Sequence, residues 1–302
     1  MNKTTLFCGA ATTVVAAAMS LGACRPASGS QDADSIAFAI TVYEDSAMSD
    51  SCEISQRLLV EYPVAADHSV AADSIRLWLR QLLADCAYPQ LSDDAPKPTP
   101  FGGSPTDVEA MTRYYGDAGM HQMLEAVKPD PDDEFQWVPM GYSNGLEATV
   151  QVQTPRYVTY TTGYSIYTGG AHGAYIIDEE TFRKSDGHHM GWDIIDTISA
   201  RPTLNALIIE GLKEYFSTPD DPNGDLLNEE LQFMELIENP DADLMSIIPL
   251  PSSAPALTAE GVSFVYQQYE IASYAAGLPS FVIPYDKAAD ILTPAAKELA
   301  GM

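Results

Sequence analysis

The sequence predicts an α+β fold in which helices pack on an antiparallel β-sheet. Extended and helical patterns follow one another as strands, helices, more strands, more helices and closing strands, without the regular alternation of a parallel α/β sheet. Hydrophobic residues make up 46% of the 302 residues, which is too many for a disordered chain. Beyond the first two dozen residues, no apolar run reaches the ~18 residues that a membrane span requires.

The first half is expected to contain two strands and two helices. Alternating residues from Ile36 to Val42 predict one strand, and the extended run from Glu53 to Tyr62 predicts another. Apolar residues at helical spacing from Ile75 to Cys86 predict a helix that packs on these strands. After a proline-rich loop at 89–105, a Ser-Pro start predicts a second helix that runs to about Val127.

The second half, from about residue 131, is expected to be richer in strands. Tyr, Thr and Val with interspersed turn residues predict consecutive antiparallel strands from Phe135 to Phe182. Helices are predicted at 204–216 and 226–237, and short strands at 262–268 and 281–283. Residues 36–302 are therefore interpreted as one α+β domain, with a strand–helix half up to about residue 130.

Residues 1–23 have the pattern of a bacterial lipoprotein signal peptide. A single charge precedes an apolar stretch from Leu6 to Met19, and small residues lead up to Cys24. We expect cleavage before Cys24 and a lipid on its thiol, which would anchor the protein to a membrane of the bacterial cell envelope. Residues 24–35 predict a flexible tether. The alternative is an ordinary signal peptide followed by a coincidental cysteine.

Two further cysteines would remain in the exported protein. In an oxidising compartment Cys52 and Cys86 are expected to form a disulfide that joins the second strand to the first helix. Two separate buried thiols are the alternative.

The charge balance restricts the class of partner. Lys and Arg number 15 against 43 Asp and Glu, which gives a formal net charge of -28. This balance argues against nucleic acid as a partner, because its binding depends largely on neutralising phosphates. Basic partners are the electrostatic expectation.

A five-residue motif resembles the nucleophile motif of serine hydrolases. Residues 141–145 read G-Y-S-N-G, but residues 146–152 predict a strand where a nucleophile elbow requires a helix. We therefore expect no catalytic residue here and a hairpin turn at Asn144-Gly145.

No metal site or cofactor is predicted. A calcium-loop pattern that includes Asp221 and Glu230 has Pro219 at its first ligand position, and proline supplies no side-chain oxygen. His172, Asp178, His188 and His189 lack a recognised ligand spacing.

The string Y-T-G-G-A-H-G at 167–173 is the candidate binding loop. Glycines at this density indicate positive φ angles or a close approach of the backbone to another element. Such a loop could bind a ligand through exposed amides and the imidazole. The structural alternative, favoured on the residues alone, is a tight bend with His172 hydrogen-bonded inside. The candidate residues are Tyr167, Gly169, Gly170, His172 and Gly173.

Together with the run from Tyr266 to Gly277 and the closing F-V-I-P-Y at 281–285, this string resembles a known bacterial family. It is similar to the extracytoplasmic domain shared by the anti-sigma factor RsiV and the peptidoglycan deacetylase PdaC, over roughly residues 36–292. The resemblance implies helices packed on an antiparallel sheet. It also implies a binding module, which in the anti-sigma member is a receptor for lysozyme.

The sequence departs from both family members. We expect a lipoprotein signal in place of a sigma-binding region with a membrane span, and we expect no deacetylase domain. We therefore expect a non-catalytic, envelope-anchored module that binds a basic protein such as lysozyme. The alternative is an envelope enzyme, or a protein that binds a small ligand or peptidoglycan through the loop at 167–173.

Overall fold

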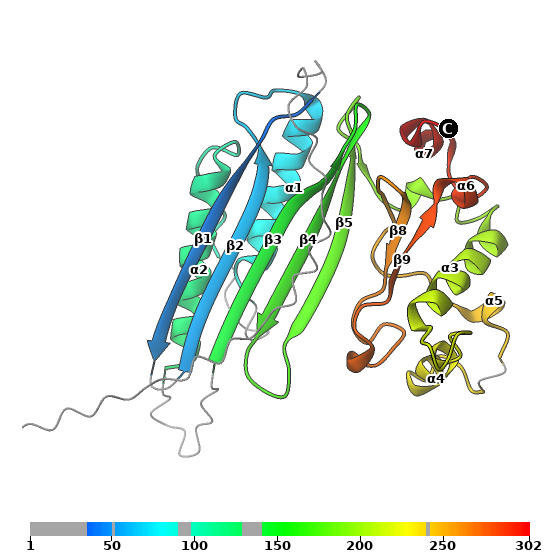
Figure 1. The fold of residues 1–302 in the computed structure, drawn as a ribbon. Coiled ribbons are helices and arrows are strands. Elements are labelled where there is room, and N and C mark those ends of the chain that lie inside the picture. Colours follow the sequence, from blue (N-terminus) through cyan, green and yellow to red (C-terminus); the bar gives the residue numbers. More distant parts are fainter. Residues whose placement is uncertain (1–34, 50–51, 90–97, 129–140, 240–241) are drawn as a thin grey trace, which may run out of the picture. The chain divides into compact units, whose positions relative to one another are not determined.

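Six strands form one sheet, and they follow one another across it in chain order (Figure 1). The computed structural model describes residues 35–49, 52–89, 98–128, 141–239 and 242–302. The strands are β1 (Phe38–Ser49), β2 (Cys52–Pro63), β3 (Gly141–Gln153), β4 (Tyr157–Tyr167), β5 (Ala174–Arg183) and β6 (His189–Met190). The mixed α+β class is thereby confirmed.

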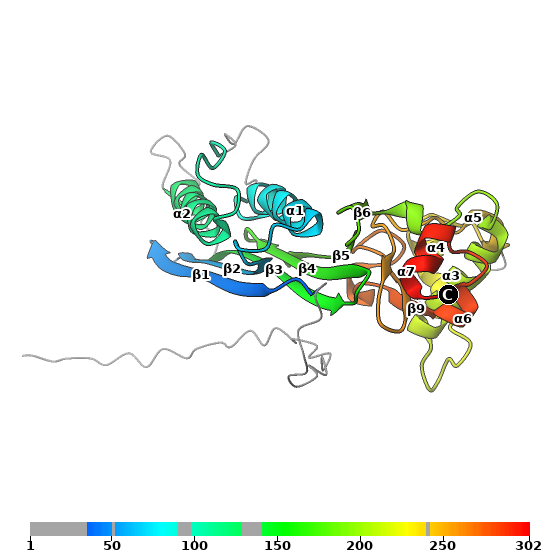
Figure 2. The same cartoon turned by 90° about the horizontal axis from the view of Figure 1, so that it is seen from above.

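One pair of strands departs from the expected antiparallel arrangement. β2 and β3 are parallel, whereas every other neighbouring pair in this sheet is antiparallel. The helices α1 (Val70–Cys86) and α2 (Val108–Ala126) lie between these two strands in the chain. The two helices carry the chain back to the end of the sheet at which β2 begins, because parallel neighbours start at the same end. Both helices cover the same face of the sheet (Figure 2).

The predicted helical face of α1 forms the centre of this layer. Ile75, Leu79 and Leu83 are fully buried and pack with apolar residues of β2, β3 and β4. The helix α2 begins at Val108, slightly later than predicted, because the Asp107 carboxylate accepts the Ala110 N–H at 3.0 Å. Within the described residues, no helix is long and apolar enough to cross a membrane.

The expected hairpin turn at Asn144-Gly145 is wrong, because both residues lie inside β3. Asn144 is buried opposite Gln56 of β2. Its Nδ2 donates to the Cys86 carbonyl at 3.0 Å, and Gln56 Nε2 donates to the Ala87 carbonyl at 2.6 Å. The last carbonyls of a helix lack partners within the helix. The two amides thus fix the end of α1 to the sheet.

The expected disulfide is also wrong: both thiols are free. Cys52 is buried beside α2, in an apolar cluster with Ile54 and Met120. Cys86 is the last residue of α1, and the carbonyl of the next residue, Ala87, accepts from Gln56. Gln56 lies four residues after Cys52 in β2. Four residues of a strand span about 13 Å. A disulfide requires Cα atoms about 4.4–6.8 Å apart.

We predict that both thiols stay reduced and unreactive in the folded protein. Burial raises the pKa of Cys86 to about 12 and also raises the pKa of Cys52. Little thiolate is therefore present at pH 8. Mass spectrometry after alkylation without reductant should show two adducts on residues 52 and 86 in denaturant, and neither under native conditions. A mass lower by two hydrogens, with no adduct on either residue in denaturant, would show that the two cysteines form a disulfide after all.

The C-terminal part adds a second, three-stranded sheet with its own helices. Its strands are β7 (Ala256–Leu257), β8 (Gly261–Val265) and β9 (Ser280–Pro284). The α-helices are α3 (Arg201–Phe216), α4 (Leu226–Phe233), α5 (Leu244–Ile247), α6 (Tyr285–Ala288) and α7 (Pro294–Ala300). Short 3-10 turns occur at η1 (Trp192–Ile194) and η2 (Tyr274–Ala276). The predicted helix at 226–237 ends early, and Glu235 beyond it has a positive φ of 59°.

Hydrogen bonds join the two sheets at β7. Thr159 Oγ1 of β4 donates to the Leu257 carbonyl at 2.6 Å, and the Leu257 N–H donates to Thr181 Oγ1 of β5 at 3.0 Å. The six-stranded sheet takes strands from both sides of the expected division near residue 130. The described residues belong to one compact unit.

Candidate functional site

The glycine-rich string forms the loop between β4 and β5. Gly169 and Gly170 have φ angles of 90° and 97°, so the positive φ predicted for this loop is confirmed. A Cβ atom on Gly170 would meet no atom within 4 Å. The backbone conformation, rather than lack of space, therefore favours glycine at this position.

His172 is exposed, and the expectation that it lies inside the protein is wrong. Its ring stacks on Tyr274 at 3.9 Å between centroids and 24° between planes. Its Nε2 lies 3.1 Å from the hydroxyl of Tyr269. Both tyrosines are about 100 residues away in sequence, so the loop meets a distant segment on the surface. We call His172, Tyr269 and Tyr274 the aromatic cluster.

The contacts of the two ring nitrogens assign the tautomer that a neutral His172 adopts. Its Nδ1 lies 2.9 Å from the Gly173 carbonyl, which can only accept, so Nδ1 carries the hydrogen. Nε2 then accepts from the Tyr269 hydroxyl. The orienting partner of the ring is a neutral carbonyl and not the carboxylate of a catalytic triad.

Two glutamine side chains hold the distant segment against the edge of β5. Gln267 accepts the Ile177 N–H at 3.3 Å and donates to the Ile177 carbonyl at 2.7 Å, as a neighbouring strand would. Gln268 accepts the Tyr175 N–H at 3.0 Å. β6 pairs only with Thr181 and Phe182, further along the strand. The two amides therefore satisfy edge groups of β5 that no strand of the described residues covers.

A tight turn follows and presents Tyr269. Glu270 accepts the Gln267 N–H at 2.7 Å and the Ser252 N–H at 2.5 Å, which fixes the turn from both sides. Tyr269 has a φ of 63°, an unfavourable value for a bulky side chain, and it is 50% exposed. Strained residues of this kind are concentrated at functional sites.

The remainder of the segment is fixed from α3 and α4. Ile271 and Ala272 are buried in the C-terminal core. Glu230 of α4 accepts the Ser273 N–H at 2.8 Å, and Tyr215 of α3 donates to the Ala276 carbonyl at 2.7 Å. Tyr274 is therefore held on a supported backbone.

Three carboxylates lie on or beside the two segments of the site. Asp178 accepts from Ser253 Oγ at 2.5 Å, while Glu230 and Glu270 accept the hydrogen bonds given above. In the part of the chain that the structure describes, none of the three has a Lys, Arg or His salt-bridge partner. The site thus combines the exposed rings of His172 and Tyr269 and the half-buried ring of Tyr274 with negative charge that no cation of the described residues neutralises.

The other sequence motifs do not join this site. Ser143 is an exposed residue of β3, not the nucleophile of a strand–helix turn. Asp221 accepts the Leu226 N–H at 3.0 Å and forms a turn before α4. His188 and His189 pair with Asp193 and Glu180 respectively. Among the described residues, no group of His, Cys, Asp and Glu is arranged to hold a metal ion.

The remaining residues of the candidate loop support its shape. The Tyr167 hydroxyl donates to the Gly170 carbonyl at 3.1 Å. A Cβ atom on Gly173 would lie 2.7 Å from the Ile166 carbonyl oxygen. Sequence reasoning missed Tyr269 and Tyr274 as site residues. The signal that could have identified them is the tyrosine- and glutamine-rich run at 266–277, the second unusual string in the chain.

A six-stranded sheet with two helices on one face, joined by hydrogen bonds at β7 to a three-stranded sheet, defines a mixed α+β architecture. Residues 193–286 match the family model described as a protein of unknown function, DUF3298. This range contains Tyr269 and Tyr274 but not the loop at 167–173.

Two crystal structures from that family are similar to this chain. A member from Bacteroides fragilis is 20% identical with a TM-score of 0.59, and the match covers 88% of this chain and 98% of that one. A Pseudomonas aeruginosa protein is 15% identical with a TM-score of 0.57, over 87% and 97% of the two chains. These similarities show the fold. The curated proteins include no match to this chain.

We predict that the strain at Tyr269 can be measured as stability. Tyr269→Ala removes the ring but keeps a side chain in the left-handed region, whereas Tyr269→Gly removes both. The glycine variant should have the larger free energy of unfolding, by about 1 kcal/mol. Urea denaturation of the two variants checks this, and equal values would show that the φ of 63° stores no strain.

Proposed function

We propose that this chain is a non-catalytic binding module of the bacterial cell envelope, held by a lipid on Cys24, which captures a basic protein at the aromatic cluster. The observation that carries this proposal is the surface stack of the exposed His172 on the half-buried Tyr274, beside the strained Tyr269. Tyrosine is enriched among residues that dominate protein interfaces, because it buries a large area at little cost in side-chain entropy.

The charge around the cluster favours a cationic partner. The carboxylates of Asp178, Glu230 and Glu270 lack cationic partners among the described residues, and the whole chain has a formal net charge of -28. Tyrosine faces attract Lys and Arg side chains through cation–π contacts. Long-range attraction would also accelerate the encounter with a basic protein.

The resemblance to the RsiV and PdaC domains supports the same conclusion. Two of the three strings that carry it, 167–173 and 266–277, are the segments that meet in the site. Lysozyme, a basic protein bound by the anti-sigma member, is therefore the first partner to test.

Peptidoglycan or another glycan is the second candidate ligand. Sugar rings can stack on exposed aromatic side chains, and the hydroxyls of Tyr269 and Tyr274 could add hydrogen bonds. Salt dependence separates the two candidates, because screening weakens attraction between exposed charges but has little effect on stacking.

We predict that His172→Ala and Tyr274→Ala weaken lysozyme binding at least about tenfold, the usual effect of truncating an interface hot spot. Their melting temperatures should stay within about 2 °C of the parent, since His172 is exposed and Tyr274 is only half-buried. Titration calorimetry at low and high salt would measure both the loss and its electrostatic component.

His121→Ala is the matched control. His121 is also exposed, at 76% of its side chain, and it pairs with Glu125 on α2, far from the site in sequence. This variant should bind like the parent. Binding by His172→Ala and Tyr274→Ala equal to that of the control would contradict the proposed site. Binding that is unaffected by salt would favour the glycan.

The lipid anchor has a separate test. Cys24→Ser should remove the acylated cysteine, so the expressed chain should accumulate as an uncleaved or aqueous form. The parent should partition into detergent, as a diacylated protein does. Detergent partitioning that is unchanged by the substitution would rule out a lipid on Cys24.

A further inference from the structure

The aromatic cluster contains one side chain of a type that changes its charge near neutral pH. The cluster consists of one histidine and two tyrosines, and of these side-chain types only histidine ordinarily gains or loses a proton between about pH 5 and pH 8. The charge on this surface therefore depends on whether His172 carries a second proton.

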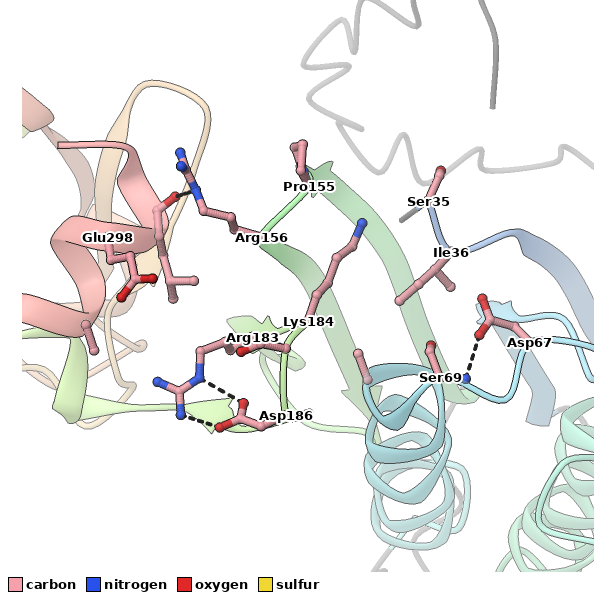
Figure 3. A pocket seen from close by; sticks show the side chains of 14 residues that line it. Ser35, Ile36, Asp67, Ser69, Pro155, Arg156, Arg183, Lys184, Asp186 and Glu298 are labelled. Atoms are coloured by element: carbon pink, nitrogen blue, oxygen red, sulfur yellow. Dashed lines mark hydrogen bonds and ion pairs between the residues drawn. The ribbon is translucent and has the colours of Figure 1, made fainter. Parts of the chain in front are cut away.

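Several cationic side chains elsewhere in the chain have a carboxylate beside them. Figure 3 shows one case, in which Asp186 accepts from Nε and Nη2 of Arg183 at 2.8 Å and 2.6 Å. Three of the five histidines also lie within ion-pair distance of a carboxylate, in the pairs His121–Glu125, His188–Asp193 and His189–Glu180. A positive charge on any of these side chains is offset by its neighbour.

His172 has no such neighbour among the described residues. Its Nδ1 faces the Gly173 carbonyl, its Nε2 faces the Tyr269 hydroxyl, and its ring stacks on Tyr274. None of the ion pairs between described residues includes it. A proton gained by His172 therefore adds a positive charge that no adjacent carboxylate offsets.

The elements that form the site carry three carboxylates, those of Asp178 on β5, Glu230 on α4 and Glu270 in the turn. Each is engaged by a hydroxyl or by backbone N–H groups, and none pairs with His172. These groups attract a cationic partner over a distance. What the partner meets on contact depends on the three rings.

Protonation of His172 would also reverse a hydrogen bond. In the neutral ring Nε2 accepts from the Tyr269 hydroxyl, whose oxygen keeps its lone pairs for a further donor such as a Lys ammonium. In the protonated ring both nitrogens donate, so the Tyr269 oxygen accepts from Nε2 and its hydrogen turns outward. The cluster then presents a donor and a positive charge in place of an acceptor and a neutral ring.

We propose that the aromatic cluster holds a cationic side chain of its partner only while His172 is neutral, so that acid releases the partner. The inference concerns the regulation of this site and rests on the proposed function. Lys and Arg bind the face of a tyrosine ring through their positive charge, and a protonated His172 would itself be the cation on the Tyr274 face. Repulsion between two like charges about 4 Å apart weakens binding about fivefold even in water.

Calorimetric titration of the parent with tetralysine at about pH 8 and about pH 5.5 tests the proposal. Tetralysine supplies the cationic groups without the remaining surface of a protein. Its affinity for the parent should fall about fivefold at the lower pH. Lysozyme is titrated in parallel and should show the same trend.

Two variants separate the charge of His172 from its ring. His172→Phe keeps a flat ring but gains no proton, so it should bind tetralysine equally at both pH values. His172→Arg carries a permanent charge on a flat group and should bind weakly at both. Both variants keep the other four histidines and Glu179, whose pKa is raised by burial, so titration elsewhere affects them and the parent alike.

His121→Phe is the matched control. It removes a histidine that is exposed at 76% of its side chain and lies on α2, and it leaves the aromatic cluster intact. This variant should show the full fall in affinity between the two pH values.

A fall in affinity that persists in His172→Phe, or that is absent from the parent, would overturn the proposal. Loss of tetralysine binding by His172→Phe at both pH values would also overturn it, because the imidazole itself, and not its charge, would then be required. Parent protein that binds tetralysine at neither pH would do the same. Lysozyme binding that is equal at both pH values would overturn this inference and leave the proposed function standing. Absence of lysozyme binding beside pH-dependent tetralysine binding would remove only lysozyme as the partner.

Discussion

The candidate site depends on one interaction: the side-chain amides of Gln267 and Gln268 on the edge of β5. An uncovered strand edge exposes backbone donors and acceptors that invite pairing with another chain. Here the Gln267 amide both accepts from and donates to Ile177, as a neighbouring strand would. This contact places a segment of the C-terminal part beside the β4–β5 loop. In this position, Tyr269 and Tyr274 lie beside His172.

The docking of Gln267 and Gln268 on β5 also accounts for the positive φ of Tyr269 and for the position of the Glu270 carboxylate. Because Gln267 and Gln268 face the strand, the chain must turn sharply after them, and the positive φ at Tyr269 is the result. The Glu270 carboxylate holds this turn through two backbone N–H groups. A carboxylate that stabilises the turn also leaves negative charge near the exposed rings. The Glu270 carboxylate therefore holds the turn and also contributes negative charge to the proposed binding site for a basic protein.

The sequence predicted most of the elements and fewer of the contacts. Periodicity located α1 and the first two strands, since burial on one face leaves a regular pattern. The sequence pattern failed at Asn144-Gly145, a dipeptide that is common in turns but lies in β3 here. The side-chain amide of Asn144 donates to the last carbonyl of α1, a contact that local patterns do not contain. Compartment chemistry predicted a pairing of Cys52 and Cys86 that their positions along β2 and α1 do not support. The glycine string marked one half of the site, but the other half depends on tertiary docking, which local patterns do not contain.

Hydrogen exchange of the lysozyme complex tests the central claim most directly. Because the two segments form one surface, amides at 168–177 and 266–277 should gain protection together when lysozyme is added, while amides on α1 and α2 should exchange unchanged. Protection of only one segment would contradict a joint site. Protection confined to the helices or to β1 would place recognition elsewhere on the molecule.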